Sequence, residues 1–591
     1  MKINMTHITK FSYGGNRYLN IFVTLFLIPS IFFFSACTKD LLEQTPRAEM
    51  SSDLFWKKTD DAVFAVNGVY DANRGTFGKD YNWDGAGEFV HTRFDDGYTD
   101  YYNPSGIGGN FDFHWRNCYK TINRANDAIE NIRLMKPNMG DASSLSLLNQ
   151  LEGEARFLRA LNYFRLIDLW GDVPFYTKKI NNNEAYDLDR TSKTIVKDTI
   201  LADLAFASSV LPKSYPTSDR GRATKMAALS FSGKVKLYWA CWMKNDNKLG
   251  EASTYYTSAA QDLKEVMNPT YGLNLFNNGD PGTYQTPNYF KLFQPDNEYA
   301  SEIIFSVQYG GPLLNQGESI LRAFGTRNTG WGECWFSPNV RLVDKYQLIS
   351  TGSYAAPLIL SSNPSTINGA INPKTYQGRD WRMRATMLWD GEKYPRTNAD
   401  GTVYLDSIAL KFKNPNGVTY INYGGMKSGY VFRKYVRVIG GYQTYDGPQD
   451  FYLMRLPDVW LMYCEAVNEV QNGPTDELFT LIDKIRYRGK LPPLDKSKFG
   501  SKESFFKAIE QERIVEFVGE GLRFFDLRRW KKVEETWPAP DGLVYYNTWG
   551  EKVRDEFKNA QTRDYQRYYI FRIPPAERDV NPKLTQNDPW L

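Results

Sequence analysis

Histidine and cysteine are scarce in this chain, since its 591 residues include only three histidines and five cysteines. So few cysteines exclude a small scaffold held together by disulfides. The formal net charge is only +4, which gives little reason to expect nucleic-acid binding. Long apolar runs are also nearly absent: mean hydropathy is −0.52 and one extended run occurs, which excludes a polytopic membrane protein.

Metal sites find little support in these residues. The two histidines beyond the N-terminal region, His91 and His114, show no His-x-x-x-His spacing, and no Cys-x-x-Cys pair accompanies them. An acidic cluster lacks the Asp-x-Asp-x-Asp-Gly pattern of a calcium loop; it consists of Asp95, Asp96 and Asp100. We therefore expect no metal and no cofactor.

The cysteines beyond residue 100 are scattered. They are Cys118, Cys241, Cys334 and Cys464. Cys118 and Cys464 fall on apolar faces of predicted helices, so we expect buried thiols. Disulfides stay an open alternative, because pairing cannot be read from sequence.

Aromatic residues, by contrast, are abundant. The chain has 15 Trp, 39 Tyr and 36 Phe, or 15% of all residues. A disordered chain would be poor in aromatics and strongly charged. The composition therefore predicts a globular protein.

The N-terminus reads as an export signal. Residues 1–20 carry Lys2, Lys10 and Arg17 and no acid, and an apolar run follows over residues 21–34. Basic residues before a short apolar run are typical of a secretory signal. A transmembrane anchor is the alternative, but the run is short for a bilayer span and Pro29 interrupts it.

Ser35-Ala36-Cys37 resembles a bacterial lipobox, in which the cysteine is lipidated and becomes the first residue of the mature protein. Phe34 stands where that pattern prefers Leu, and an ordinary cleavage site before a cysteine is the alternative. Several acyl chains on one N-terminus would anchor the protein durably. We predict a signal peptide over 1–36, lipidation at Cys37, and a tether over 37–53.

The next part, residues 54–270, is predicted to be helical. Apolar residues from Trp115 to Ile132 follow a 3-4-3-4-3 spacing, which places one face of a helix in the core. The pattern predicts further helices near 54–71, 151–170, 192–211, 224–243 and 254–267, with a long loop region over 72–112. Consecutive helices with short turns indicate stacked pairs like those of tetratricopeptide arrays.

The second part, residues 271–591, is predicted to be mixed. Gly, Pro, Asn and Tyr are frequent over 271–450, where apolar runs are short, as in Glu302-Ile-Ile-Phe-Ser-Val307. Helices return within 451–530, and the tail is irregular and aromatic. The predicted fold class is mainly α, with tetratricopeptide-like helix pairs packed against an irregular, loop-rich part with small strands.

Several separated motifs then carry a family resemblance. They are Glu154-Ala-Arg-Phe-Leu-Arg-Ala160 with Leu169-Trp-Gly-Asp-Val-Pro174, Gly221-Arg-Ala-Thr-Lys225, Tyr452 to Ala466, Ile485-Arg-Tyr-Arg-Gly489, Glu512 to Trp530, and Ile573 to Asn587. Together they resemble the SusD/RagB family and come in the family's order. Cys464 departs from the pattern, which usually has Ala there.

The resemblance implies a surface lipoprotein of the outer membrane, anchored by lipid and facing the cell exterior. Such proteins are not enzymes. They bind glycans, or in some members peptides, and cover a SusC-type TonB-dependent transporter. A surface glycoside hydrolase is a third hypothesis.

The acidic motif near the C-terminus favours a scaffold over catalysis. Glu512, Glu516 and Glu520 lie four residues apart on one predicted helix face. A glycosidase needs two carboxylates flanking a sugar, but neighbouring arginines would keep these acids ionised. The arginines we expect nearby are Arg513, Arg523, Arg528 and Arg529. We predict no catalytic residues.

The ligand site is expected to be aromatic, because flat rings cover the C–H faces of sugars and polar side chains bond the hydroxyls. Two loop regions fit, near residues 81–102 and 331–335. For each single aromatic, core packing stays the alternative. The predicted ligand-binding residues are Trp83, Tyr98, Tyr101, Tyr102, Trp331 and Trp335.

Overall fold

The computed structural model describes residues 55–92, 111–311 and most of 314–591. Gaps fall at 315, 327–331, 360–362, 364, 370–371, 398–401, 409–410, 414–418, 422–428, 438–445, 537–543, 547–551 and 555–563. Residues 59–591 form one compact unit, and residues 1–58 are assigned to a second. Cys37, the signal peptide and the tether lie outside the described residues. The predicted boundary at residue 270 stays a prediction.

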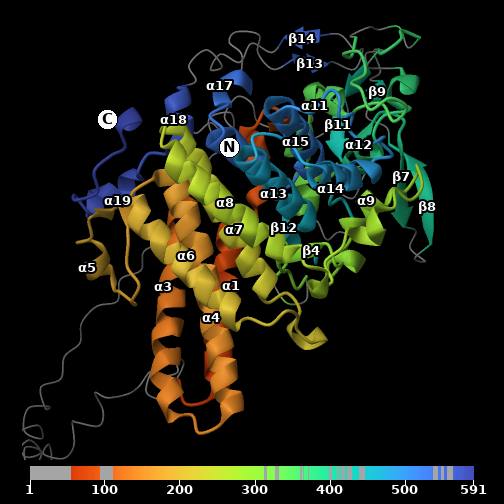
Figure 1. The fold of residues 1–591 in the computed structure, drawn as a ribbon. Helices are drawn as coiled ribbons and strands as arrows, with labels where there is room; N and C mark the ends of the chain where they lie inside the picture. The colour runs from red at the N-terminus through yellow and green to blue at the C-terminus, as the bar shows by residue number, and fades with distance from the viewer. Residues whose placement is uncertain are drawn as a thin grey trace, which may run out of the picture. The chain divides into compact units, whose positions relative to one another are not determined.

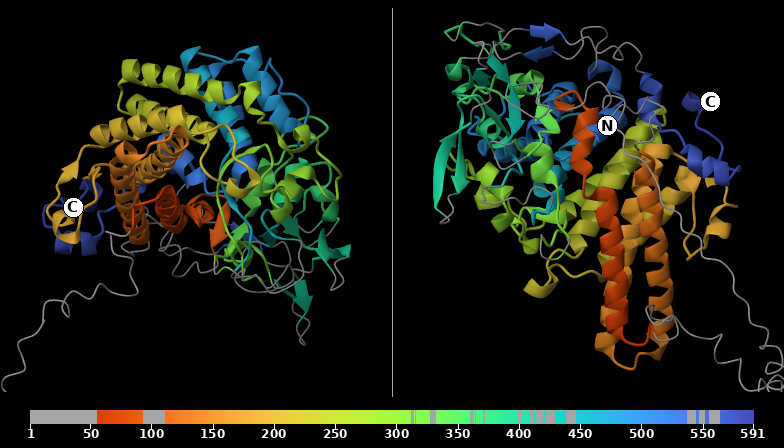
Figure 2. Two further views of the ribbon diagram at one scale, coloured as in Figure 1. Left: turned by 90° about the horizontal axis from the view of Figure 1, so that it is seen from below. Right: turned by 180° about the vertical axis from the view of Figure 1, so that it is seen from behind.

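The N-terminal half of the compact unit is built from long helices, as predicted. Neighbours in sequence pack on one another, from α1 on α3 through to α7 on α8, and α8 also contacts α13. Figures 1 and 2 show these helices side by side. They are α1 (Thr59–Phe77), α3 (Asp112–Met135), α4 (Ala142–Trp170), α6 (Lys193–Val210), α7 (Lys225–Asn245) and α8 (Leu249–Val266).

Several of these helices begin where a side chain can cap them. The Asp141 carboxylate accepts from the Ser144 backbone N–H at 2.7 Å at the start of α4, and Thr224 caps α7 in the same way. Gly171 ends α4 with a φ of 72°, a conformation that favours glycine. The boundary predicted for the first helix was wrong, since α1 continues to Phe77.

The other half has short helices and paired short strands. Helices return as α13 (Leu456–Val470), α14 (Asp476–Tyr487), α15 (Lys502–Phe517) and α16 (Arg523–Arg529). Strand β4 (Ile303–Val307), which lies in the short apolar run noted in the sequence, pairs antiparallel with β12 (Phe451–Arg455). The other ladders are β1 (Val90–Thr92) with β5 (Phe336–Pro338), β2 (Val173–Pro174) with β3 (Arg190–Thr191), β6 (Met387–Trp389) with β11 (Tyr430–Phe432), β7 (Lys393–Thr397) with β8 (Val403–Ser407), β9 (Lys411–Lys413) with β10 (Thr419–Ile421), and β13 (Val544–Tyr546) with β14 (Lys552–Arg554).

Smaller elements fill the connections. Segment η1 (Asp80–Ala86) is a short 3-10 helix inside the region predicted as a long loop. Short helices also occur in the predicted irregular tail, at α18 (Tyr565–Tyr569) and α19 (Pro575–Val580). The rest are α5 (Asn182–Ala185), α9 (Asn288–Leu292), α10 (Ile320–Phe324), α11 (Val340–Lys345), α12 (Trp381–Thr386), α17 (Val533–Thr536), η2 (Lys136–Asn138), η3 (Thr217–Asp219), η4 (Pro269–Tyr271), η5 (Phe276–Gly279), η6 (Pro295–Asn297), η9 (Pro373–Tyr376) and η11 (Asp588–Trp590).

The three motif glutamates form buried ion pairs, as predicted. Glu512, Glu516 and Glu520 are at most 4% exposed. Their partners lie 2.6–3.2 Å away: Arg382 and Arg486 for Glu512, Arg382, Arg455 and Arg488 for Glu516, and Lys434 and Arg455 for Glu520. Charges buried in this way are stable only when paired.

The partners differ from those expected in the sequence motif. Arg513 and its motif neighbours bond other acids, because their helix faces point to other elements. Arg513 pairs with Asp458 and Asp526, Arg523 with Glu88 and Glu510, Arg528 with Asp168, and Arg529 with Glu465 and Asp526. The motif therefore ties α15 and α16 to helices from both halves of the chain.

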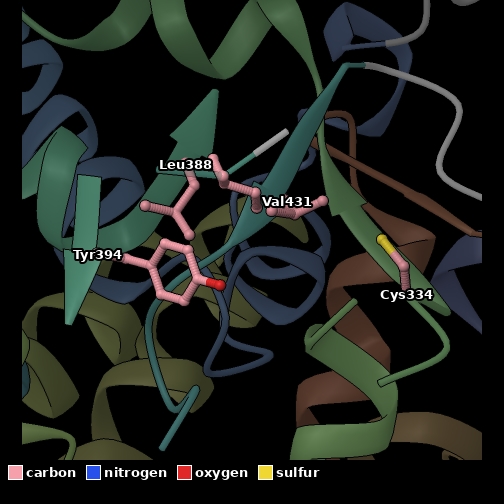
Figure 3. Close-up of a cluster of buried hydrophobic side chains, with 5 residues drawn as sticks. Cys334, Leu388, Tyr394 and Val431 are labelled. Carbon is pink, nitrogen blue, oxygen red and sulfur yellow. The ribbon is translucent and has the colours of Figure 1, made fainter. Parts of the chain in front are cut away.

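The four described cysteines, Cys118, Cys241, Cys334 and Cys464, are buried and free. The predicted buried thiols are confirmed, and these four form no disulfide with one another. Figure 3 shows Cys334 in a buried cluster with Leu388, Tyr394 and Val431. In the part of the chain that the structure describes, no helix is both long and apolar enough to cross a membrane.

Candidate functional site

Described residues that belong to the first predicted ligand region, and those that follow the second, meet at one small ladder. Strand β1 ends at Thr92, which pairs with Phe336 at the start of β5. In the sequence, residues 93–102 of the first predicted region directly follow Thr92, and Trp335 of the second directly precedes Phe336. Tyr98, Tyr101, Tyr102 and Trp331 lie outside the described residues, so their part in a site stays a prediction. Trp335 and Trp83 are described.

Trp83 belongs to the core. Its side chain is 2% exposed and stacks on Phe111 at 5.2 Å, His114 at 4.8 Å and Phe524 at 5.0 Å between ring centroids. No face of the indole is open to a ligand. The expectation that Trp83 binds ligand is therefore corrected: the core-packing alternative holds at this residue, because residues distant in sequence converge on it.

Segment η1 is a rigid base beside the ladder. Asp80 accepts from the Trp83 indole N–H at 3.2 Å and pairs with Arg165 at 2.6 Å. Asp84 accepts from the backbone N–H groups of Gly519 at 2.6 Å and Gly521 at 3.2 Å. Burial raises the pKa of Asp84 to about 7 in spite of these two donors.

Gly85 lets this base lie directly against the ladder. A Cβ atom at this position would come within 2.9 Å of both the Phe336 ring and the Thr92 methyl group. Tyr81, which is 2% exposed, packs edge-on against Phe336 from the same segment. The β1–β5 ladder is therefore supported by η1 through Tyr81 and Gly85.

The second loop is closed at its base by backbone hydrogen bonds. Glu333 N–H donates to the Arg322 carbonyl and Cys334 N–H to the Gly325 carbonyl, both at 2.8 Å. Gly332 approaches the Gly325 backbone so closely that an added Cβ would lie 2.0 Å from its carbonyl oxygen. Residues 325–326 and 332–334, which flank the predicted segment with Trp331, therefore lie side by side next to α10.

Trp335 is held by two charged side chains. Its indole N–H donates to Glu333 Oε2 at 2.8 Å, and the Arg322 guanidinium lies 4.2 Å from the centre of its ring. Arg322 and Glu333 pair with each other at 3.2 Å. The Trp335 side chain is half-buried. This arrangement fixes the orientation of an aromatic ring that is still partly open to solvent.

Lys79 adds a second cation to this site. Desolvation, and after it the positive charge of Arg322, lowers the pKa of Lys79. Sequence reasoning missed Lys79 and Arg322, because neither is part of a motif: Arg322 sits in the apolar run Ile320–Phe324. Glu333 lies within the region 331–335 that was predicted to bind ligand, but the sequence indicated no role for it.

The side chains at this site are suited to binding a ligand. An oriented indole covers an apolar face of a ligand, while guanidinium, ammonium and carboxylate groups bond hydroxyls. Glu333 is already engaged by Arg322 and Trp335. Among the described residues no group of three or more His, Cys, Asp or Glu could hold a metal ion.

The acidic residues of the C-terminal motif offer no catalytic alternative. Burial by itself would raise the pKa of Glu516, but Arg488, Arg455, Arg382 and Lys434 together hold it below its ordinary value. A general acid for glycoside cleavage needs the opposite shift. Glu516 is also fully buried, at 0% exposure.

Comparison with known families gives two matches that together span most of the chain. The SusD family matches residues 301–590. A family described as "Starch-binding associating with outer membrane" matches residues 55–237.

Individual proteins resemble the chain over nearly its whole length. SusD-like protein P25 of Formosa agariphila is 26% identical, over 96% of this chain and 98% of that protein. A crystal structure of a SusD-like protein from Bacteroides fragilis has a TM-score of 0.72 at 23% identity, covering 92% of this chain and 99% of that one. A structure described as a laminarin-binding SusD-like protein has a TM-score of 0.62 at 22% identity, covering 90% and 99%.

Proposed function

The chain belongs to the SusD family, and on this premise we propose that it is a non-catalytic lipoprotein of the cell surface. It binds an oligo- or polysaccharide and passes it to a SusC-type TonB-dependent transporter in the outer membrane. The observation that carries the proposal is the partly open Trp335 ring, which Arg322 and Glu333 hold next to the start of the β1–β5 ladder.

A sugar is the ligand that fits this chemistry best. A partly open indole suits the C–H face of a pyranose ring, and the charged groups around it suit its hydroxyls. The matched family descriptions support a glycan too, since one names starch binding and one similar structure is described as binding laminarin.

Membrane attachment is proposed from Cys37. The lipobox-like Ser35-Ala36-Cys37 would supply acyl chains at the mature N-terminus, and the description of one matched family places it at the outer membrane. In this proposal the protein faces the cell exterior, where it can meet its glycan before transport. Copurification with a transporter encoded beside it would test the partnership.

Two alternatives predict different outcomes. A peptide-binding member of the same architecture would use the same Trp335 site for a different ligand. A surface glycoside hydrolase has less support, because Glu512, Glu516 and Glu520 are buried and paired with arginines and a lysine.

The test is calorimetric titration of the purified protein against starch-derived and laminarin-derived oligosaccharides, and against a peptide panel. We expect binding of an oligosaccharide and no release of reducing ends on long incubation. Binding of peptides alone would show that the ligand is a peptide and not a glycan. Steady release of reducing ends would contradict the non-catalytic assignment.

A further inference from the structure

We propose that the protein has a second sugar-binding groove, separate from the Trp335 site. It lies between α1, the turn over residues 217–222 and strand β4, and has a volume of about 600 Å³. That volume falls in the range of small-molecule sites. The inference rests on the proposed function, because it assumes that the ligand is a glycan.

One wall of the groove is fixed by Arg222. Its guanidinium donates to Asn67 Oδ1 at 2.8 Å and pairs with Glu154 at 2.9 Å and Asp219 at 3.1 Å. Glu154 is fully buried beneath it, at 0% exposure. This side chain therefore joins α1, α4 and the 217–222 turn and sets the width of the groove.

The floor depends on a close approach of Gly221 to Gln308 at the end of β4. A Cβ at Gly221 would lie 1.9 Å from the Gln308 amide, and the residue has a φ of 93°. Residues other than glycine rarely adopt this conformation, and a side chain at this position would displace the Gln308 amide. The Gln308 amide in turn donates to the Tyr299 hydroxyl at 3.2 Å.

Tyr299 provides an aromatic surface next to the groove, because it contacts Gln308 and Arg220, which line the groove. Its side chain is 56% exposed, and the Arg220 guanidinium lies 5.4 Å from its ring centre. Arg220 is exposed and lines the groove, and in the described part of the chain no carboxylate pairs with it. An exposed ring beside a guanidinium with unused donors is the combination that binds a sugar ring at its face and its hydroxyls.

The charges along the groove favour a neutral ligand. Asp71 pairs with Arg74 at 2.5 Å and Asp219 with Arg222 at 3.1 Å, so these charges cancel and Arg220 is left as a single positive charge among the described residues of the lining. Amide groups, which both donate and accept, contribute much of the remaining surface. A hydroxyl-rich, uncharged oligosaccharide matches this lining better than a polyanion or an apolar ligand.

The groove and the Trp335 site are at different places along the same helix. The groove follows α1 from Asn67 to Arg74, whereas Lys79 of the Trp335 site lies beyond the end of the helix. Tyr309 stands between them, with Arg74 over its ring and its hydroxyl donating to the Gly78 carbonyl at 3.0 Å. From Asn67 to Phe77 the helix rises about 15 Å, so two short oligosaccharides can bind at once.

The experiment measures how many copies of a short oligosaccharide bind. The probe is the shortest starch-derived or laminarin-derived oligosaccharide that the unaltered protein binds in calorimetry. We expect two copies for the unaltered protein, and one after Tyr299→Ala or Arg220→Ala, with the affinity at the remaining site unchanged. Trp335→Ala combined with Tyr299→Ala should abolish binding.

Tyr487→Ala is the matched control, since Tyr487 is 55% exposed on α14. It should leave both copies in place. Binding of a single copy that survives Tyr299→Ala and is lost in Trp335→Ala would overturn the second groove and leave the proposed function intact. Absence of binding to every oligosaccharide tested would instead contradict the proposed function, and with it this inference.

Discussion

Thr92 and Phe336 are direct partners in the β1–β5 ladder. The pairing joins two segments far apart in the chain, and each adjoins a region predicted from the sequence to bind ligand. Segment η1 packs against this ladder through Gly85, so the described residues of the ladder have a fixed support. The proposed ligand site follows from this relationship, and the predictions below test its parts.

Arg322 is expected to orient Trp335, because its planar guanidinium contacts both the indole ring and the Glu333 carboxylate. Arg322→Lys keeps the positive charge but loses the stacking on the indole and the paired contact with Glu333. Cation–π contacts of this kind are worth about 0.5–1 kcal/mol at exposed sites, so we expect glycan affinity to fall several-fold in calorimetry. Arg396→Lys is the control, because Arg396 pairs with Asp406 on an exposed hairpin. Equal affinity in both variants would contradict the role of Arg322.

The buried glutamates are predicted to stabilise the fold. Glu516→Gln leaves Arg455 and Arg488 buried with one charge fewer nearby. Breaking a buried pair costs about 3–5 kcal/mol in the free energy of unfolding, which denaturant unfolding measures. Lys496→Met removes an exposed pair with Asp476 and should cost about 0–1 kcal/mol. A similar, small loss in both variants would show that the buried network contributes little.

The raised pKa of Asp84 predicts that the stability of the protein depends on pH. Its folded pKa is raised to about 7, chiefly by burial, so the folded protein retains a proton that the unfolded chain releases near its ordinary pKa of about 4. The contribution of this group to stability is therefore present at low pH and falls as pH rises through that interval.

Asp84→Asn keeps an oxygen acceptor for Gly519 and Gly521 and removes the ionisation. Relative to the unaltered protein, the variant should gain up to about 1.4 kcal/mol per pH unit as the pH rises toward 7. Unfolding free energies at about pH 5 and about pH 7 measure this difference. If the difference in unfolding free energy between the two proteins does not change with pH, the predicted role of Asp84 is contradicted.

Cys37 predicts membrane attachment. Cys37→Ser should remove the acyl chains and release the protein from the outer-membrane fraction, because the anchor depends on that thiol. Mass spectrometry of the mature N-terminus and cell fractionation give the readout. Cys118→Ser controls for loss of a thiol, although Cys118 is buried and the change is expected to lower stability. Membrane retention of the Cys37→Ser protein would contradict lipid anchoring at this residue.

Local patterns predicted the helices well. The spacing from Trp115 to Ile132 places a buried face on α3 because residues three and four apart share a helix face. Thr224 was correctly predicted to begin α7, because an N-cap side chain bonds the backbone next to it. Both patterns are local, because each relates residues that are three or four positions apart in the sequence.

Contacts between residues far apart in the chain could not be predicted from the sequence. Trp83 was assigned to a ligand site, although Phe111 and Phe524 enclose it, and Phe524 comes from the far end of the chain. The partners of Glu516 were misassigned for the same reason, since Arg382 and Arg455 come from other elements. Three-residue strands such as β1 and β5 are too short to predict from alternation. Pairing between distant segments depends on the whole fold and leaves no local pattern.

The most direct test of the central claim is the affinity of Trp335→Ala for the oligosaccharide that the unaltered protein binds. The matched control is Trp242→Ala, which removes another half-buried tryptophan, on α7. The Trp335 site predicts at least about tenfold weaker binding at that site in Trp335→Ala, typical of a central aromatic contact, and little change in Trp242→Ala, with both variants folded by circular dichroism. A folded Trp335→Ala protein that keeps full affinity at every site would contradict the account.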